Sequence, residues 1–229
     1  CPLDRYRTMR GIFAGLRDVD AEALAPYADA KEIDFTSQKV TATFRAGWGV
    51  LETLEGVRHL PLLETVNLKE CRGLKDVTAL GELEHLKSAD LTYTAAAIPE
   101  FQLHKKGDPV RVGAYGDEGS GYGPSRQVKT MQRALRIAVA IEADDAKALK
   151  ALGPIDALLL PHWPHAHIAG VRHLKELESF QVWSDTLTDL SALEGAKKLS
   201  TLELGRRGGG TGPACTAVTE LPPLPKGIK

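Results

Sequence analysis

The phrase Gly56-Val-Arg-His-Leu60 recurs in this chain as Gly170-Val-Arg-His-Leu174, and both copies continue with a leucine and a glutamate at matching positions. The copies are 114 positions apart, which is five steps of about 22.8 residues. Internal repeats with a period between about 20 and 50 residues are typical of solenoids. The phrase therefore predicts two members of one periodic array rather than two copies of one domain.

Short alternating apolar segments follow the same step. Val66-Asn-Leu68 is followed 23 positions later by Ala89-Asp-Leu91. In the second half the steps are 21 or 22, and the segments are Ile137-Ala-Val139, Leu158-Leu-Leu160, Phe180-Gln-Val182 and Leu202-Glu-Leu204. Val110-Arg-Val112 lies in the gap between the two series and is expected to be a further strand. Such alternation is typical of β-strands, so we expect short strands at a regular step.

The residues around these strands carry a recognisable pattern: Leu63-x-x-Val66-x-Leu68-x-x-Cys71-x-x-Leu74 in the first half, and Leu177-x-x-Phe180-x-Val182-x-x-Asp185-x-Leu187 in the second. The continuation Leu187-Thr-Asp-Leu190-Ser-Ala-Leu193 fits the same scheme. The pattern resembles the leucine-rich repeat family, in its internalin-type subclass of 22-residue repeats. The resemblance implies an α/β solenoid, a curved right-handed stack of short parallel strands with helical or irregular convex segments. It implies one domain over residues 1–229.

The ends and the middle of the chain depart from the repeat. Residues 1–45 are expected to form a helical N-terminal cap and the first coil, with Asp20 as a helix N-cap. Residues 95–126 contain a glycine-rich stretch and predict an irregular insertion, followed by a helix from Ser125 to about Leu135. Residues 206–229 predict a C-terminal tail, and Pro222-Pro-Leu-Pro225 favours an extended chain there.

Composition excludes several classes of protein. The 229 residues are 43% hydrophobic and 26% charged, which suits a folded core. Lysine and arginine number 29 against 30 acidic residues, so no strong positive field favours nucleic acid. No stretch approaches the length and apolarity of a membrane span. Cys1 has two interpretations, a fragment boundary or the lipid-anchored N-terminus of a mature bacterial lipoprotein; otherwise we favour a cytoplasmic protein.

A histidine-rich turn is the main candidate for chemistry. His162, His165 and His167 lie within six positions, and neutral imidazoles are common zinc and copper ligands. No Cys, Asp or Glu lies in the segment to complete a site, so a solvent-facing turn is the preferred interpretation. No Gly-x-Ser-x-Gly motif is present. We therefore expect no catalytic activity, no metal and no cofactor.

Alternation along the strands predicts which side chains face the open side of the sheet. In the first half these positions are polar and include Asn67 and Asp90. In the second half they include Ala138 and Ala140, and an apolar patch with polar neighbours: Trp183, Trp163, Leu159, Pro161, Gln181 and Glu203, with His162 and Arg206 at its border. Such patches are typical of protein interfaces.

We therefore expect a non-catalytic scaffold that binds another protein on its concave face, with Trp183 as the anchor. Three alternatives stay open at this stage. The histidine turn could bind a metal or a small ligand, the chain could be a regulatory or targeting domain of a larger enzyme, or the insertion or the tail could cover the patch within the same molecule.

Overall fold

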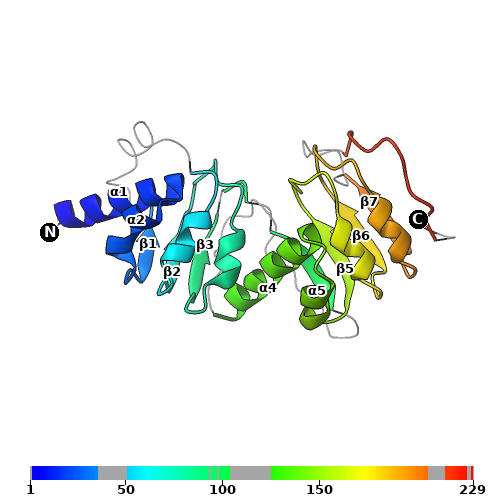
Figure 1. Ribbon diagram of the computed structural model, residues 1–229, viewed down its shortest axis with the longest axis horizontal. Helices are drawn as coiled ribbons and strands as arrows, with labels where there is room; N and C mark the ends of the chain where they lie inside the picture. The colour runs from blue at the N-terminus through cyan, green and yellow to red at the C-terminus, as the bar shows by residue number, and fades with distance from the viewer. Residues whose placement is uncertain are drawn as a thin grey trace. The chain divides into compact units, whose positions relative to one another are not determined.

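The computed structural model describes residues 2–35, 51–92, 94–96, 98–103, 125–205, 215–225 and 228. These residues form a mixed α/β protein with short strands (Figure 1). They group into two compact units, and the division falls inside one helix, between Gln132 and Arg133. This differs from the single domain that the sequence predicts. Within the described residues no helix has the length and apolarity needed to cross a membrane.

The first unit contains a helical pair followed by three strands. Its elements are α1 (Pro2–Asp18), α2 (Ala21–Leu24), η1 (Ala25–Tyr27), β1 (Glu32–Asp34), η2 (Glu55–His59), β2 (Thr65–Asn67), η3 (Thr78–Glu82), β3 (Ser88–Asp90) and the start of α4 (Ser125–Glu142). The strands are parallel in the order β1-β2-β3. Ile33, Val66 and Ala89 pair across the sheet and are buried, so they form one layer of the core.

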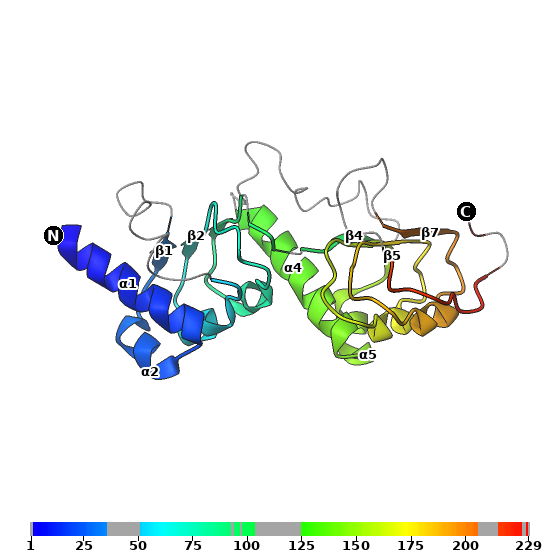
Figure 2. The same ribbon diagram turned by 90° about the horizontal axis from the view of Figure 1, so that it is seen from above.

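The second unit contains the remainder of α4 and a four-stranded sheet. Its other elements are β4 (Glu100–Leu103), α5 (Ala146–Leu152), β5 (Ile155–Leu160), η4 (Ala169–His173), β6 (Ser179–Val182), η5 (Ser191–Gly195) and β7 (Thr201–Leu204). The strand order is β4-β5-β6-β7, with β4 antiparallel to β5 and the other pairs parallel. In the second unit the strands lie on one side and the helical segments on the other (Figure 2).

The predicted step is confirmed by the strand pairing. Val66 pairs with Ala89, 23 positions later, and Leu158, Phe180 and Leu202 pair in succession with steps of 22. A parallel pairing partner one repeat away is what a coil of 22 to 23 residues requires. The strands nevertheless form two separate sheets, so the structure does not show the single solenoid that the sequence predicts.

The main break in the predicted series is helix α4. The sequence predicts a strand at Ile137-Ala-Val139, but these residues lie inside a helix of 18 residues. Three alternating residues fit a strand and a buried helix equally well, and the surrounding helical spacing decides between them. That spacing is visible in the fully buried Val128, Met131, Leu135 and Ile141. Ala138 and Ala140 are therefore not on a sheet face.

Several other predictions concern residues outside the described ranges. These are Cys1, the possible strand at Val110–Val112, Arg206 and most of the glycine-rich insertion and of the tail's first half. At the described start of the insertion, where we expect irregular chain, residues 100–103 form strand β4.

The two units repeat one order of elements, from α1 to β3 in the first and from α4 to β7 in the second, with β4 as the addition. Equivalent positions are 125 apart up to the first parallel strand, as from Ile33 to Leu158, and 114 apart from the repeated phrase onward, as from Gly56 to Gly170. The first unit therefore has 11 more residues between its first strand and the phrase. The phrase marks corresponding places in two units, and not two coils of one array.

The turn between the two helices of each unit shows this correspondence in atomic detail. Val19 and Asp144 both have a positive φ, of 51° and 55°. The next residue, Asp20 or Asp145, donates its backbone N–H to the carbonyl five residues earlier, at 2.9 Å in both units. The same aspartate caps the following helix by accepting two backbone N–H groups, which confirms the predicted N-cap at Asp20.

These caps lead to a first testable prediction. Replacing Asp145 by alanine removes the acceptor for the N–H groups of Lys147 and Ala148, and we expect a loss of about 1 kcal/mol in the free energy of unfolding. Urea denaturation measures this loss. Asp145→Asn is the matched control, because its amide oxygen still accepts hydrogen bonds. Equal losses in both variants would contradict the capping role.

Gln132 closes the far end of the first unit. Its side chain is buried and its Nε2 donates to the carbonyl oxygens of Leu80 at 3.0 Å and Leu83 at 2.7 Å. These carbonyls belong to the segment around η3, which no further coil follows. The first half of α4 thus satisfies backbone groups that a following repeat would otherwise cover.

Candidate protein-binding surface

The outward side of the second sheet carries a row of side chains in register. Leu159 on β5 pairs with Gln181 on β6, which pairs with Glu203 on β7. All three are partly exposed, whereas the strand neighbours Leu158 and Phe180 are buried. The alternation predicted from the sequence therefore holds along β5 and β6, and it places one apolar, one amide and one acidic group side by side.

Trp183 lies directly after β6, at the end of this row. Its backbone N–H donates to the carbonyl of Leu160 at 3.0 Å, and its own carbonyl accepts the N–H of Trp163 at 2.8 Å. The ladder between β5 and β6 thus continues past the strands and fixes the backbone at Trp183. The side chain is partly exposed, and the ring of His162 meets it edge-on at 6.2 Å. We call Trp183, Leu159, Gln181, Glu203 and His162 the Trp183 surface.

Trp163 and Pro161 are not accessible, although the sequence places both in the exposed patch. Trp163 is only 4% exposed, and its indole N–H donates to the carbonyl of His167 at 2.9 Å. Pro161 is also buried. His162 has a positive φ of 50°, which interrupts the alternation of the strand, so the parity used to place side chains no longer applies beyond it. Trp163 instead forms the apolar centre of the turn.

Ser184 holds the segment behind Trp183. Its buried hydroxyl donates to the carbonyl of Trp163 at 2.6 Å and accepts the backbone N–H of Leu187 at 2.9 Å. The hydroxyl also accepts the N–H of Thr186. The backbone on both sides of Trp183 is therefore fixed by hydrogen bonds, and the indole is presented from a rigid position.

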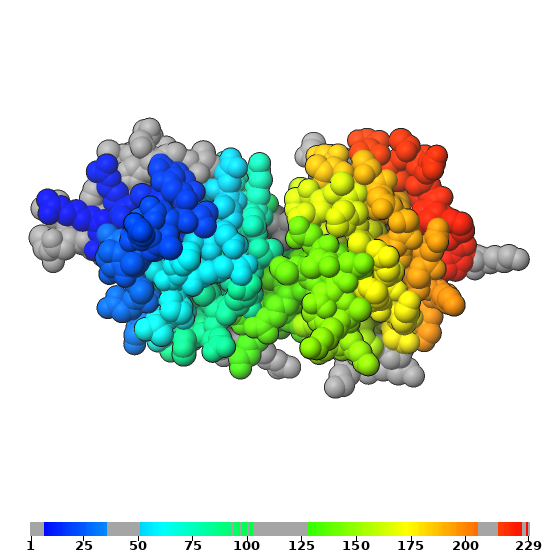
Figure 3. Space-filling model, in the orientation of Figure 1, coloured from blue at the N-terminus to red at the C-terminus, as the bar shows by residue number. Residues whose placement is uncertain are grey.

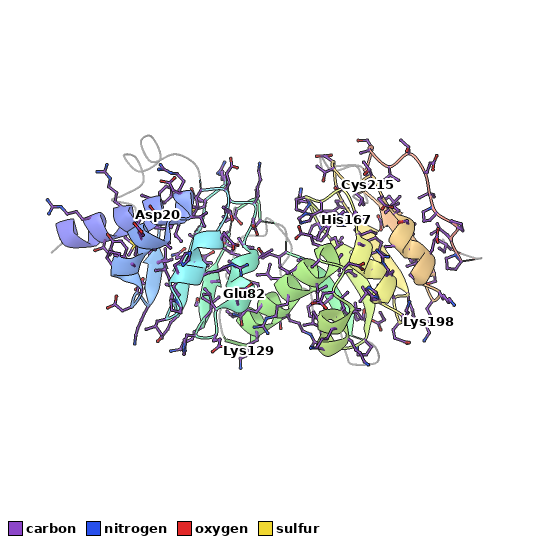
Figure 4. All side chains as sticks on the ribbon, in the orientation of Figure 1. Asp20, Glu82, Lys129, His167, Lys198 and Cys215 are labelled. Atoms are coloured by element: carbon purple, nitrogen blue, oxygen red, sulfur yellow. The ribbon has the colours of Figure 1, made fainter. Side chains whose placement is uncertain are left out.

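The start of the described tail reaches the same end of the sheet. The thiol of Cys215 donates to the carbonyl of Val182 at 3.3 Å, and burial raises the pKa of this thiol. Cys215 is labelled in Figure 4. The tail thus contacts the residue before Trp183 while the indole remains partly exposed. The described part of the tail does not cover the Trp183 surface completely.

The histidines of the turn do not converge. His162 contacts the ring of Trp183, whereas His165 places Nδ1 3.2 Å from Glu142 Oε1 and packs against the ring of Trp163. His167 forms a backbone bridge with Asp189, and the pKa of that carboxyl is lowered because Ser191 donates hydrogen bonds to it. Among the described residues no group of three or more His, Cys, Asp or Glu side chains could hold a metal ion.

Arg172 and His173 of the repeated phrase have a structural role on the opposite side. His173 Nε2 lies 2.9 Å and Arg172 Nη2 3.2 Å from the carboxylate of Asp144. In the first copy Arg58 pairs with Glu55 and Glu82. The sequence predicts a solvated helix start at residues 144 and 145; it does not reveal that Asp144 joins the helical turn to the repeated phrase.

Asn67 and Asp90, the other two predicted contact residues, lie in the first unit. They pair with each other across β2 and β3, and Asn67 pairs with Asp34 on β1. Each side chain also accepts the N–H two residues later, from Lys69 at 3.4 Å and Thr92 at 3.0 Å. This polar row belongs to a different sheet from Trp183, so the structure does not gather all eight predicted residues on one sheet.

Comparisons with known proteins identify no family. No family model matches the chain, and no curated protein does. Among solved structures, an internalin C2 from Listeria monocytogenes matches with 14% identity and a TM-score of 0.22 over 81% of this chain. The match spans 63% of that protein's length. A TM-score at this level is too low to carry an argument about fold or function.

Proposed function

We propose that this chain is a non-catalytic protein-recognition scaffold that binds another protein through the Trp183 surface. The observation that carries the proposal is a partly exposed tryptophan at the end of the in-register row of Leu159, Gln181 and Glu203. Tryptophan is enriched among the residues that dominate interface energies, and a polar border around an apolar centre is the usual anatomy of an interface.

Rigidity of the surface supports the same function. Backbone hydrogen bonds and the Ser184 hydroxyl hold the segment around Trp183. A partner that binds here does not have to order this segment, which lowers the entropic cost of association. Within each unit, parallel strands at a step of 22 to 23 residues support the proposal that the scaffold consists of leucine-rich-repeat-type coils.

The alternatives receive less support. Binding of a metal by the histidine turn is not favoured, because His162, His165 and His167 contact different partners. A role as a regulatory or targeting domain of a larger enzyme stays a prediction from the sequence. So do the expectations that nucleic acid does not bind and that Cys1 marks either a lipid anchor or a fragment boundary.

The test of the proposed function is the variant Trp183→Ala. We expect a natural partner, identified by affinity capture and then purified, to bind the variant about 30-fold more weakly, as expected for an anchor worth about 2 kcal/mol. Isothermal titration calorimetry measures both affinities. Circular dichroism should show an unchanged fold, because the side chain is only partly buried.

Leu62→Ala is the matched control, because Leu62 is a 42%-exposed apolar side chain of the first unit. Its loss should leave the affinity unchanged if binding is specific to the Trp183 surface. A partner that binds Trp183→Ala and the unaltered chain equally tightly would overturn the assignment of this surface.

A further inference from the structure

The described tail contains a segment whose backbone is constrained by its own sequence. Glu220-Leu-Pro-Pro-Leu-Pro225 has prolines at three of its six positions. Each proline fixes its own φ near −65°. Each also disfavours the helical region for the residue before it, which applies to Leu221, Pro222 and Leu224. Together these constraints favour the polyproline II conformation over most of the segment.

The structure agrees with such a conformation. Residues 219–225 form neither helix nor strand, and their backbone groups make no hydrogen bond with another described backbone group. Figure 3 shows the described tail, in red, on the surface at one end of the second unit. An extended chain without internal hydrogen bonds leaves its carbonyl groups available to a partner.

Burial along the segment follows the three-residue period of this helix. Polyproline II has three residues per turn, so Glu220 and Pro223 share one ridge and both are exposed. Pro222 and Pro225 share a second ridge and both are partly buried. Leu221, on the third ridge, is 57% exposed and is the most exposed large apolar side chain in the described chain.

The geometry points to a docking role for this segment. We propose that Glu220–Pro225 is itself a ligand, recognised by a protein domain whose groove is lined with aromatic side chains. Such grooves bind Pro-x-x-Pro segments because proline rings pack between the aromatic rings and the preformed helix loses little entropy on binding. Pro222 and Pro225 provide this spacing, and the exposed Leu221 and Pro223 add apolar area.

The way in which the tail is held leaves the segment accessible. The printed hydrogen bonds of the described tail lie at its start, where the Cys215 thiol contacts Val182 and the N–H of Val218 donates to the carbonyl of Cys215. The proline segment begins after this anchored turn. The partner of the tail therefore differs from the partner of the Trp183 surface, and the two interactions can be tested separately.

The experiment uses the full chain and two purified probes, an SH3 domain and a WW domain, each labelled with ¹⁵N. We expect at least one probe to bind saturably, with chemical-shift changes confined to the aromatic groove. The double variant Pro222→Ala/Pro225→Ala should weaken that binding at least tenfold. Leu221→Ala, which removes a mostly exposed side chain, should weaken it several-fold without affecting folding.

Pro164→Ala is the matched control, because Pro164 is exposed and lies outside the tail; its affinity for the probe should equal that of the unaltered chain. Trp183→Ala should also bind the probe normally, which separates this inference from the proposed function. Binding of neither probe, shift changes outside the groove, or undiminished binding of the double proline variant would overturn the proposal.

Discussion

Replacing Phe180 by alanine is expected to lower the free energy of unfolding by about 3–5 kcal/mol. Phe180 is fully buried on β6, the strand that lies between β5 and β7, and it pairs with Leu158 on one side and Leu202 on the other. Its removal would leave a cavity in a layer that both neighbouring strands contribute to. Chemical denaturation followed by tryptophan fluorescence measures the loss, because Trp163 and Trp183 lie in the same unit.

Leu202→Ala is the matched control for this variant. Leu202 lies in the same layer but is only partly buried, so its loss should cost clearly less than the loss of Phe180. If both substitutions cost the same, the core of the second unit would not be centred on β6 as the structure has it.

The second large effect concerns the glycine of the repeated phrase. Gly170→Ala would place a Cβ 2.6 Å from the Cα of Ile141 and 2.9 Å from the carbonyl oxygen of Ala140. Both atoms belong to the backbone of α4, so no side-chain rotation can relieve the overlap. We expect a loss of about 1–3 kcal/mol from overpacking, measured by thermal or chemical unfolding.

The first copy of the phrase offers an internal control. At Gly56 a Cβ would meet the Cα of Leu16 at 3.1 Å, which is tight but can be relieved by a small shift. Gly56→Ala should therefore destabilise the protein less than Gly170→Ala. The opposite order would contradict the closer approach of α4 to the phrase in the second unit.

Much of the local structure can be predicted from the sequence because it depends on local chemistry. The strands around Val66, Ala89, Phe180 and Leu202 follow from period-two alternation, and the N-cap at Asp20 follows from the preference of aspartate for that position. The helix expected from Ser125 is also present, although it extends to Glu142. Each of these features is determined by a few neighbouring residues.

The grouping of the elements could not be predicted in the same way. Equal spacing of two phrases is compatible with a continuous array and with two units, and only the helical spacing across residues 128–141 separates them. The reading of Ile137-Ala-Val139 as a strand preserved the apparent period of the array. The correspondence between Asp20 and Asp145 was present in the sequence, but the 11-residue difference in offset concealed it.

For the candidate site, the sequence predicts the in-register row but not the fate of the turn that follows. Leu159, Gln181 and Glu203 are where alternation places them, because they lie within strands. Trp163 lies beyond His162, whose left-handed backbone cannot be predicted from a residue that seldom adopts it. Its indole was therefore assigned to the surface when it is needed to fill the turn.

Helix α4 has a consequence for dividing this chain into fragments. The compact units meet within it, so a cut at the boundary would leave Arg133–Glu142 as ten residues at the start of one fragment. An isolated helix shorter than about 12–15 residues is marginal in water. A fragment meant to carry the second unit should therefore begin before Ser125, and one meant to carry the first should retain Gln132 together with the rest of the helix. The two halves are separable as folds but not as pieces of sequence.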